Sequence, residues 1–133
     1  MARADIAVVD DDPVLQELLR DVLEEAGYAV RGWPVTSATF VALRAAPPDL
    51  VVLEVHPSAA PGGWALLERL CADELTAAIP VIVWSTDSGP LAERLVQLRT
   101  RGCAIVGKPF DLDALLATIA HLLADRGVAA GAR

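Results

Sequence analysis

Strand-like and helix-like segments alternate along the whole chain, and this alternation limits the possible fold more than any other feature of the sequence. The apolar runs that we expect to be strands are residues 6–9, 28–33, 50–55, 79–85 and 103–106. Near-continuous apolar strands are typical of parallel sheets that helices cover on both faces. Because parallel strands are joined by right-handed crossovers, the pattern predicts an α/β fold with a doubly wound, five-stranded parallel sheet.

The segments between the strands carry signals that begin helices. Asp12 and Pro13 open the first helix, as cap and first helical residue. Either Thr36 or Ser37 is expected to cap the second helix, and Asp111 the last one. The last three helices are expected over residues 64–73, 90–101 and 112–124. The expected apolar stripe of the first helix comprises Leu15, Leu18, Leu19, Val22, Leu23 and Ala26.

Length and charge narrow the class of protein. The 133 residues fit one domain, expected over residues 1–126, followed by a frayed tail at residues 127–133. No apolar run reaches the ~18 residues of a membrane span, and the start lacks the apolar core of an export signal. A net charge of −7 disfavours binding to nucleic-acid phosphates. We therefore expect a cytoplasmic protein with neither a membrane nor a nucleic-acid partner.

Residues that can carry chemistry follow four of the expected strands. They are Asp10, Asp11, Asp12, Glu54, His56, Ser85, Thr86 and Lys108. Because open parallel sheets place their sites at the carboxyl ends of the strands, we expect these residues at one edge. Mg²⁺ prefers oxygen ligands and takes only one or two carboxylates, and a lysine can neutralise a phosphoryl oxygen. The group therefore favours magnesium-assisted phosphoryl chemistry.

At these residues the chain resembles the receiver domain of two-component response regulators. The motifs that carry the resemblance are residues 8–13, 48–54, 79–86 and 108–110, and the likeness extends over about residues 6–123. It implies a flavodoxin-like sheet in the order 2-1-3-4-5, flanked by five helices. It also implies a signalling domain whose partners are proteins of a two-component or related pathway. No DNA-binding or catalytic domain is expected after residue 125, so we expect the domain to stand alone.

The resemblance implies roles for the acidic side of this group. Asp10 and Asp11 correspond to the acidic pair that holds Mg²⁺, directly and through water. The backbone carbonyl of His56 corresponds to the group that completes the metal site. Glu54 stands at the phosphoacceptor position, which is aspartate in the family.

Four more positions acquire roles from the same resemblance. Ser85 corresponds to the hydroxyl that turns toward the phosphoryl group, and Thr86 to the small residue after it. Lys108 corresponds to the lysine that bonds the acceptor and its phosphate. Ile105 occupies the place of an aromatic residue whose rotation is coupled to the hydroxyl.

Three departures from the family pattern argue against phosphorylation-driven switching. Glu54 is longer than aspartate by one methylene, about 1.5 Å. Pro57 follows the acceptor position by three residues, where the family has four, so the His56 carbonyl is expected to be displaced. Ile105 is stiff at its first torsion and has no ring to swing. We therefore expect Mg²⁺ binding to be weak or absent.

Three functions are compatible with these observations. The favoured one is a non-enzymatic signalling module, an atypical receiver that acts by protein–protein interaction, in which a Glu54–Lys108 ion pair could imitate part of the phosphorylated state. The second is a phosphorylation-switched receiver that accepts phosphate from a histidine kinase. The third is a small magnesium-dependent phosphohydrolase. Trp64 is the tryptophan most expected to be exposed to a partner, and the sequence does not specify an oligomeric state.

Overall fold

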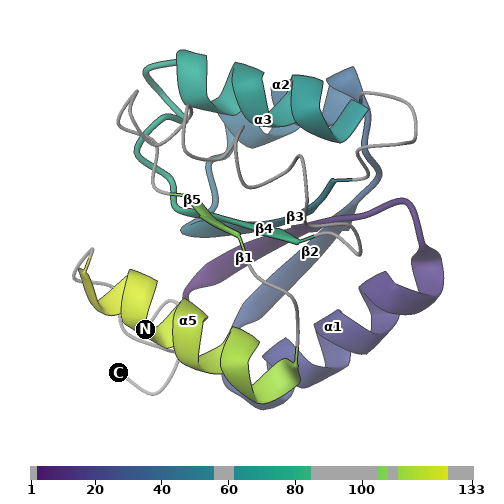
Figure 1. Cartoon of the computed structure of the whole chain (residues 1–133), viewed down its shortest axis with the longest axis vertical. Helices are drawn as coiled ribbons and strands as arrows, with labels where there is room; N and C mark the ends of the chain where they lie inside the picture. Colours follow the sequence, from purple (N-terminus) through teal and green to yellow (C-terminus); the bar gives the residue numbers. More distant parts are fainter. Residues whose placement is uncertain (1–2, 56–61, 85–104, 108–110, 126–133) are drawn as a thin grey trace.

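The fold is a five-stranded parallel sheet between two layers of helices (Figure 1). The structure, a computed structural model, describes residues 3–55, 62–84, 105–107 and 111–125. The strands are β1 (Asp5–Val9), β2 (Ala29–Trp33), β3 (Leu50–Glu54), β4 (Val81–Trp84) and β5 (Ile105–Gly107). Their order is β2-β1-β3-β4-β5, and every neighbouring pair is parallel. The predicted sheet and strand order are confirmed.

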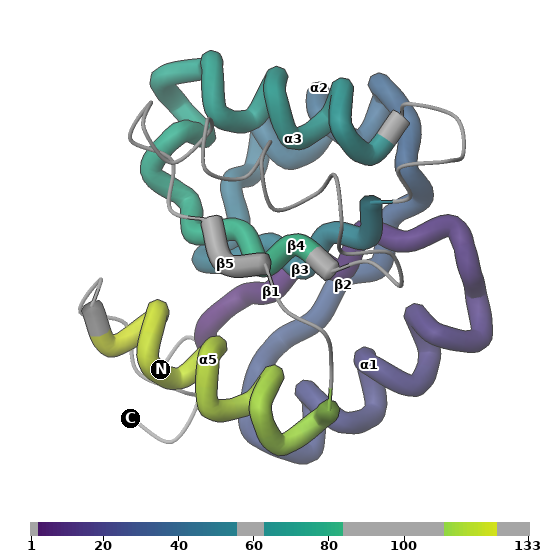
Figure 2. Tube along the Cα trace, viewed as in Figure 1, coloured from purple at the N-terminus to yellow at the C-terminus, as the bar shows by residue number. Residues whose placement is uncertain are grey.

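Helices of the described residues cover both faces of the sheet, as the path of the chain in Figure 2 also shows. The helices are α1 (Pro13–Glu25), α2 (Ser37–Ala45), α3 (Gly62–Ala72) and α5 (Leu112–Asp125). Helices α1 and α5 lie on one face, and α2 and α3 lie on the other. The helix expected over residues 90–101 and the tail at residues 127–133 lie outside the described residues.

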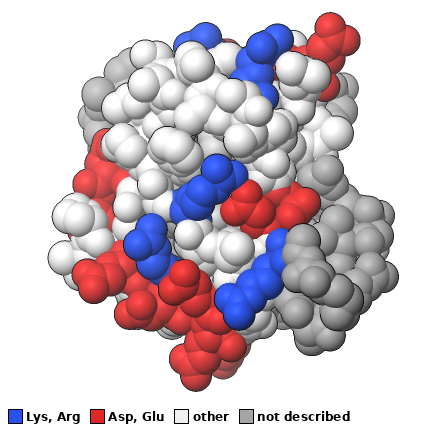
Figure 3. Space-filling view, turned by 180° about the vertical axis from the view of Figure 1, so that it is seen from behind, with Lys and Arg blue, Asp and Glu red and all other residues white. Residues whose placement is uncertain are grey.

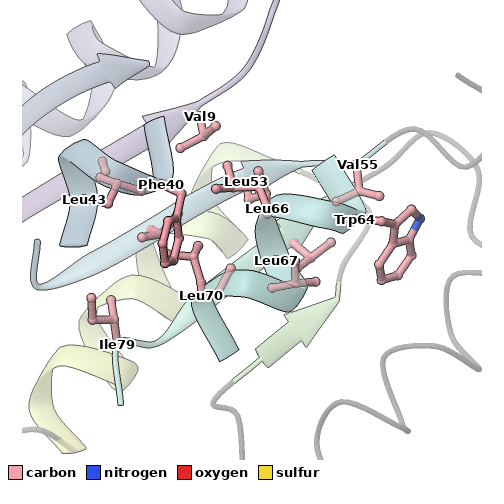
Figure 4. Close-up of a cluster of buried hydrophobic side chains, with 14 residues drawn as sticks. Val9, Phe40, Leu43, Leu53, Val55, Trp64, Leu66, Leu67, Leu70 and Ile79 are labelled. Carbon is pink, nitrogen blue, oxygen red and sulfur yellow. The ribbon is translucent and has the colours of Figure 1, made fainter. Parts of the chain in front are cut away.

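Alternation along the strands divides the core between the two faces. In β1, Ala7 and Val9 pack toward α2 and α3, whereas Ile6 and Val8 pack toward α1 and α5. The cluster on the α2–α3 face contains Phe40 (Figure 4). Because side chains alternate with a period of two, the strands of this sheet are apolar on both faces, as the sequence predicted.

The predicted caps of α1, α2 and α5 are confirmed, whereas α3 begins at Gly62, two residues before the predicted start at residue 64. Asp12 is the N-cap of α1 and accepts a hydrogen bond from the Val14 N–H at 3.0 Å. Thr36, the first of the two residues considered, caps α2. Asp111 accepts a hydrogen bond from the Ala114 N–H at 2.6 Å at the start of α5. These caps satisfy amide groups that have no partner inside the helix.

Two expectations about burial were wrong. Leu18 is 47% exposed, because it lies about 100° around the helix from the line through Leu19 and Leu23, which are buried. Ala26 is exposed as well, since it lies after the last helical residue of α1. Trp64 is only 4% exposed and belongs to the core cluster, at whose edge it lies beside Val55 in the first turn of α3 (Figure 4).

None of the helices in the described part of the chain is long and apolar enough to span a bilayer.

Candidate functional site

Strand register brings two carboxyl groups together at the carboxyl edge of the sheet. The last paired residues of β1 and β3 are Val9 and Leu53, so Asp10 and Glu54 follow at neighbouring positions. Alternation places both on the face of the sheet covered by α1 and α5. Asp10 is 1% exposed and Glu54 is half-buried. The predicted grouping of strand-end acids is therefore realised for this pair.

Backbone and side-chain hydrogen bonds hold Asp10 in place. Its Oδ1 accepts from the Asp12 N–H at 2.8 Å, and its own N–H donates to the Trp33 carbonyl at 3.0 Å. The Gln16 amide nitrogen donates to the carbonyls of Asp10 and Trp33, at 2.6 and 2.7 Å. Gln16 therefore clamps the ends of β1 and β2 together from α1.

The buried Asp10 carboxyl is costly to ionise in this position. Burial, opposed by the Asp12 N–H and reinforced by the Glu54 carboxyl and the Asp12 charge, raises the pKa of Asp10 to about 7. Asp10 Oδ2 is buried and accepts no hydrogen bond from a donor in the described residues. A buried carboxylate with acids beside it is destabilised, so a proton or a cation at Asp10 would stabilise this edge of the sheet.

The orphan oxygen of Asp10 is the observation that fits a magnesium ion here. Mg²⁺ is commonly held by one or two carboxylates and several waters. Asp11 is exposed, and its Oδ1 accepts from the Val35 N–H at 2.8 Å. Within the described ranges, no group of three His, Cys, Asp or Glu side chains is arranged around a metal position.

A glycine controls how closely α3 approaches this edge. A Cβ built on Gly63 would lie 2.8 Å from the Glu54 carbonyl oxygen and 3.3 Å from Val55 Cα. Only glycine allows that approach, so Gly63 fixes the end of β3 against the start of α3. The pair Gly62–Gly63 was the signal in the sequence, although its contact with Glu54 depends on a loop path that the sequence does not specify. Gln16 carried no such signal, since a glutamine on a helix is usually solvated.

The remaining predicted site residues lie beyond what the structure describes. These are His56, Ser85, Thr86 and Lys108, together with the side chain of Ile105, whose backbone belongs to β5. The expected ion pair between Glu54 and Lys108 therefore stays a prediction.

Comparison with known proteins gives consistent results. A family model of the response regulator receiver domain matches residues 6–120. The DNA-binding dual master transcriptional regulator RpaA of Synechocystis sp. is 34% identical over 122 residues, 89% of this chain and 48% of RpaA. The chain spans about half the length of the curated transcriptional regulators that it matches.

Solved structures agree with the family match. The signal receiver domain of a histidine kinase from Syntrophus aciditrophicus is 28% identical, with a TM-score of 0.70, covering 92% of this chain and 91% of that one. The chemotaxis protein CheY4 of Vibrio cholerae shares the fold, with a TM-score of 0.74 and 22% sequence identity. The match covers 92% of this chain and 100% of CheY4.

Proposed function

Because this chain belongs to the response regulator receiver domain family, we propose that it is a signalling module that binds partner proteins without the usual aspartate phosphorylation. The observation that carries the proposal is the place of Glu54 at the end of β3, where Gly63 of α3 packs closely against its backbone carbonyl. A glutamate therefore stands, on a backbone that cannot easily shift, at the position where the family has an aspartate.

The extra methylene of Glu54 explains why the substitution matters. It carries the carboxyl carbon about 1.5 Å further from the backbone than in aspartate. Misplacement of a reacting group on the order of 1 Å can cost about a hundredfold in rate. The close packing of Gly63 on the Glu54 carbonyl opposes a backbone shift that would compensate. We therefore expect Glu54 to be a poor nucleophile toward a phosphodonor.

The other site residues keep their proposed positions around Glu54. Asp10 and Asp11 would hold Mg²⁺, with the backbone carbonyl of His56 as a further ligand. Bound Mg²⁺ would neutralise carboxylate and phosphoryl charge. Ser85, Thr86, Ile105 and Lys108 are proposed at the phosphoryl and switch positions.

Intact-mass spectrometry with Mg²⁺ and acetyl phosphate tests the proposal. We expect the wild type to remain unmodified and Glu54→Asp to gain one phosphoryl group, because the shorter side chain restores the acceptor geometry. Glu54→Gln checks for modification elsewhere, and Glu24→Asp, an exposed α1 position, is the matched control for shortening a glutamate. A stoichiometric, base-labile phosphoryl adduct on Glu54 of the wild type would overturn the proposal.

One observation favours a second function, a phosphorylation-switched receiver that accepts phosphate from a histidine kinase. The buried oxygen of Asp10 without a donor is available to a metal, which such a receiver needs. Equal modification of wild type and Glu54→Asp in the same experiment would favour this second function.

A further inference from the structure

A cavity of about 280 Å³ lies between α2 and α3, away from the Asp10–Glu54 pair. Its lining consists of Val35, Thr36, Ser37, Ala65, Leu66 and Arg69. Ligand pockets for drug-sized molecules are typically about 300–1,000 Å³. The cavity is therefore at the lower limit for such a molecule and suits a single apolar side chain.

Two long side chains connect α2 and the α3 region beside the cavity. Arg69 of α3 lies over the Phe40 ring of α2 at 4.1 Å, and Arg44 of α2 pairs with Asp73 at 2.7 Å. Ser37 of α2 and Ala65 of α3 also line the cavity, and both have small, exposed side chains. Small residues of the two helices therefore leave this space open.

The residues that line the cavity on both the α2 side and the α3 side lie next to contacts with predicted site residues. On the α2 side, the Val35 N–H donates to the Asp11 carboxylate at 2.8 Å. On the α3 side, Gly63 packs against the Glu54 carbonyl two residues before Ala65. The shape of the cavity therefore depends on backbone contacts with residues at the carboxyl edge of the sheet.

Charge distinguishes this part of the surface from the rest of an acidic chain. Arg69 is the single charged residue of the lining, and α2 contains no acidic residue. The side of the molecule seen in Figure 3 carries acidic side chains mainly in its lower half, and its upper half is largely uncharged. With a net charge of −7, the protein as a whole disfavours the approach of acidic partners. The cavity is a place where an acid is favoured.

We infer that the α2–α3 cavity binds a short acidic segment of a partner protein, whose apolar side chain fills the gap while an adjacent carboxylate pairs with Arg69. Arginine suits this task because its planar group can hold a carboxylate through two parallel hydrogen bonds. Stacking on Phe40 orients the guanidinium beforehand, so less side-chain freedom is lost on binding. This inference rests on the proposed function as a protein-interaction module and names the surface that does the binding.

Selection from a random peptide library displayed on phage tests the inference. Peptides are selected on the full wild-type chain and counter-selected on Ala65→Phe, which fills the cavity from an exposed helical position. We expect enriched peptides to carry a large apolar residue beside Asp or Glu. A synthetic peptide of that sequence should bind at least tenfold more weakly to Ala65→Phe and to Arg69→Gln, measured by calorimetry.

Matched variants separate the cavity from general effects. Arg20→Gln removes an exposed arginine of α1 and should leave binding unchanged. Ser37→Leu fills the cavity from the opposite wall and should reproduce the loss seen with Ala65→Phe. Replacing the peptide's Asp by Asn should cost as much as Arg69→Gln, with no further loss when both are combined. Circular dichroism confirms that each variant is folded.

Three outcomes would overturn the inference: no enrichment over Ala65→Phe, enrichment of basic peptides, or equal affinity for the wild type and the filled variants. Failure of the proposed function would appear elsewhere, as a phosphoryl adduct on Glu54, which leaves peptide binding at the cavity unaffected. The two failures can therefore be distinguished.

Discussion

The two ends of β1 both carry buried or half-buried acids, and they differ in what compensates them. At the amino end, Asp5 accepts from Arg31 at 2.5 Å, and the Asp49 carboxylate accepts from the Asp5 N–H at 2.7 Å. At the carboxyl end, the Glu54 carboxyl adds to the raised pKa of Asp10, and one oxygen of Asp10 finds no donor among the described residues. We call an acid compensated when a positive group pairs with its carboxylate, and uncompensated when it is buried without such a partner. A compensated acid stabilises the fold, whereas an uncompensated one needs a proton, a cation or a ligand.

The largest expected effect is the pH dependence of stability at the carboxyl end. The pKa of Asp10 is about 7 in the folded protein, against 3.8 ordinarily. The folded state therefore binds this proton more tightly than the unfolded state. The resulting stabilisation is complete below pH 3.8 and is lost as the pH rises through about 7. Since one pKa unit corresponds to about 1.4 kcal/mol, the loss should amount to a few kcal/mol.

Urea unfolding of the wild type and Asp10→Asn from pH 4 to 8 measures this effect. The asparagine is neutral at every pH, and its amide can donate to Glu54, so its stability should fall less as the pH rises. Glu24→Gln, which neutralises an exposed acid of α1, is the matched control and should follow the wild type. Identical pH slopes for the wild type and Asp10→Asn would contradict the assignment.

The same contrast shows what could be predicted from the sequence. The alternation of apolar strands and helices predicted the parallel sheet. Because right-handed crossovers make the strands parallel, their carboxyl ends share one edge, and the acids after Val9 and Leu53 were expected there. The burial of Asp10, with one oxygen left without a donor among the described residues, was not predicted. It depends on how the elements around the strand end pack together, which no local pattern encodes.

Residues missed or misjudged in the sequence share a physical cause. The Gln16 clamp and the burial of Trp64 both depend on how a helix sits against the sheet. Periodicity identifies the buried face of a helix only to within about one position, as the exposed Leu18 beside the buried Leu19 shows. Tertiary position, rather than composition, decides these cases.

A smaller effect is expected where α3 meets the carboxyl end of β3. In Gly63→Ala the new Cβ would lie 2.8 Å from the Glu54 carbonyl, a backbone atom that cannot rotate away. We expect a loss of about 1–3 kcal/mol in the free energy of unfolding, as for other overpacked sites. Thermal and urea unfolding measure it.

Gly32→Ala provides the matched comparison for that substitution. Its Cβ would lie 2.6 Å from Gln16 Oε1, which is the far end of a side chain and can move. We therefore expect a smaller loss than for Gly63→Ala. A larger loss for Gly32→Ala would mean that the Gln16 clamp matters more to stability than the packing of α3 on Glu54.

The smallest effect is expected at the compensated end of β1. Arg31 and Asp5 form an ion pair whose side chains are 41% and 30% exposed, so solvent screens much of their attraction. Arg31→Gln should therefore reduce the free energy of unfolding by about 1 kcal/mol or less. The loss should shrink further in high salt, because added ions weaken the wild-type pair and leave the variant unchanged. Urea unfolding at low and high salt measures both quantities. A loss comparable to the pH effect of Asp10 would mean that compensated and uncompensated acids contribute alike, and the distinction between the two ends of β1 would fail.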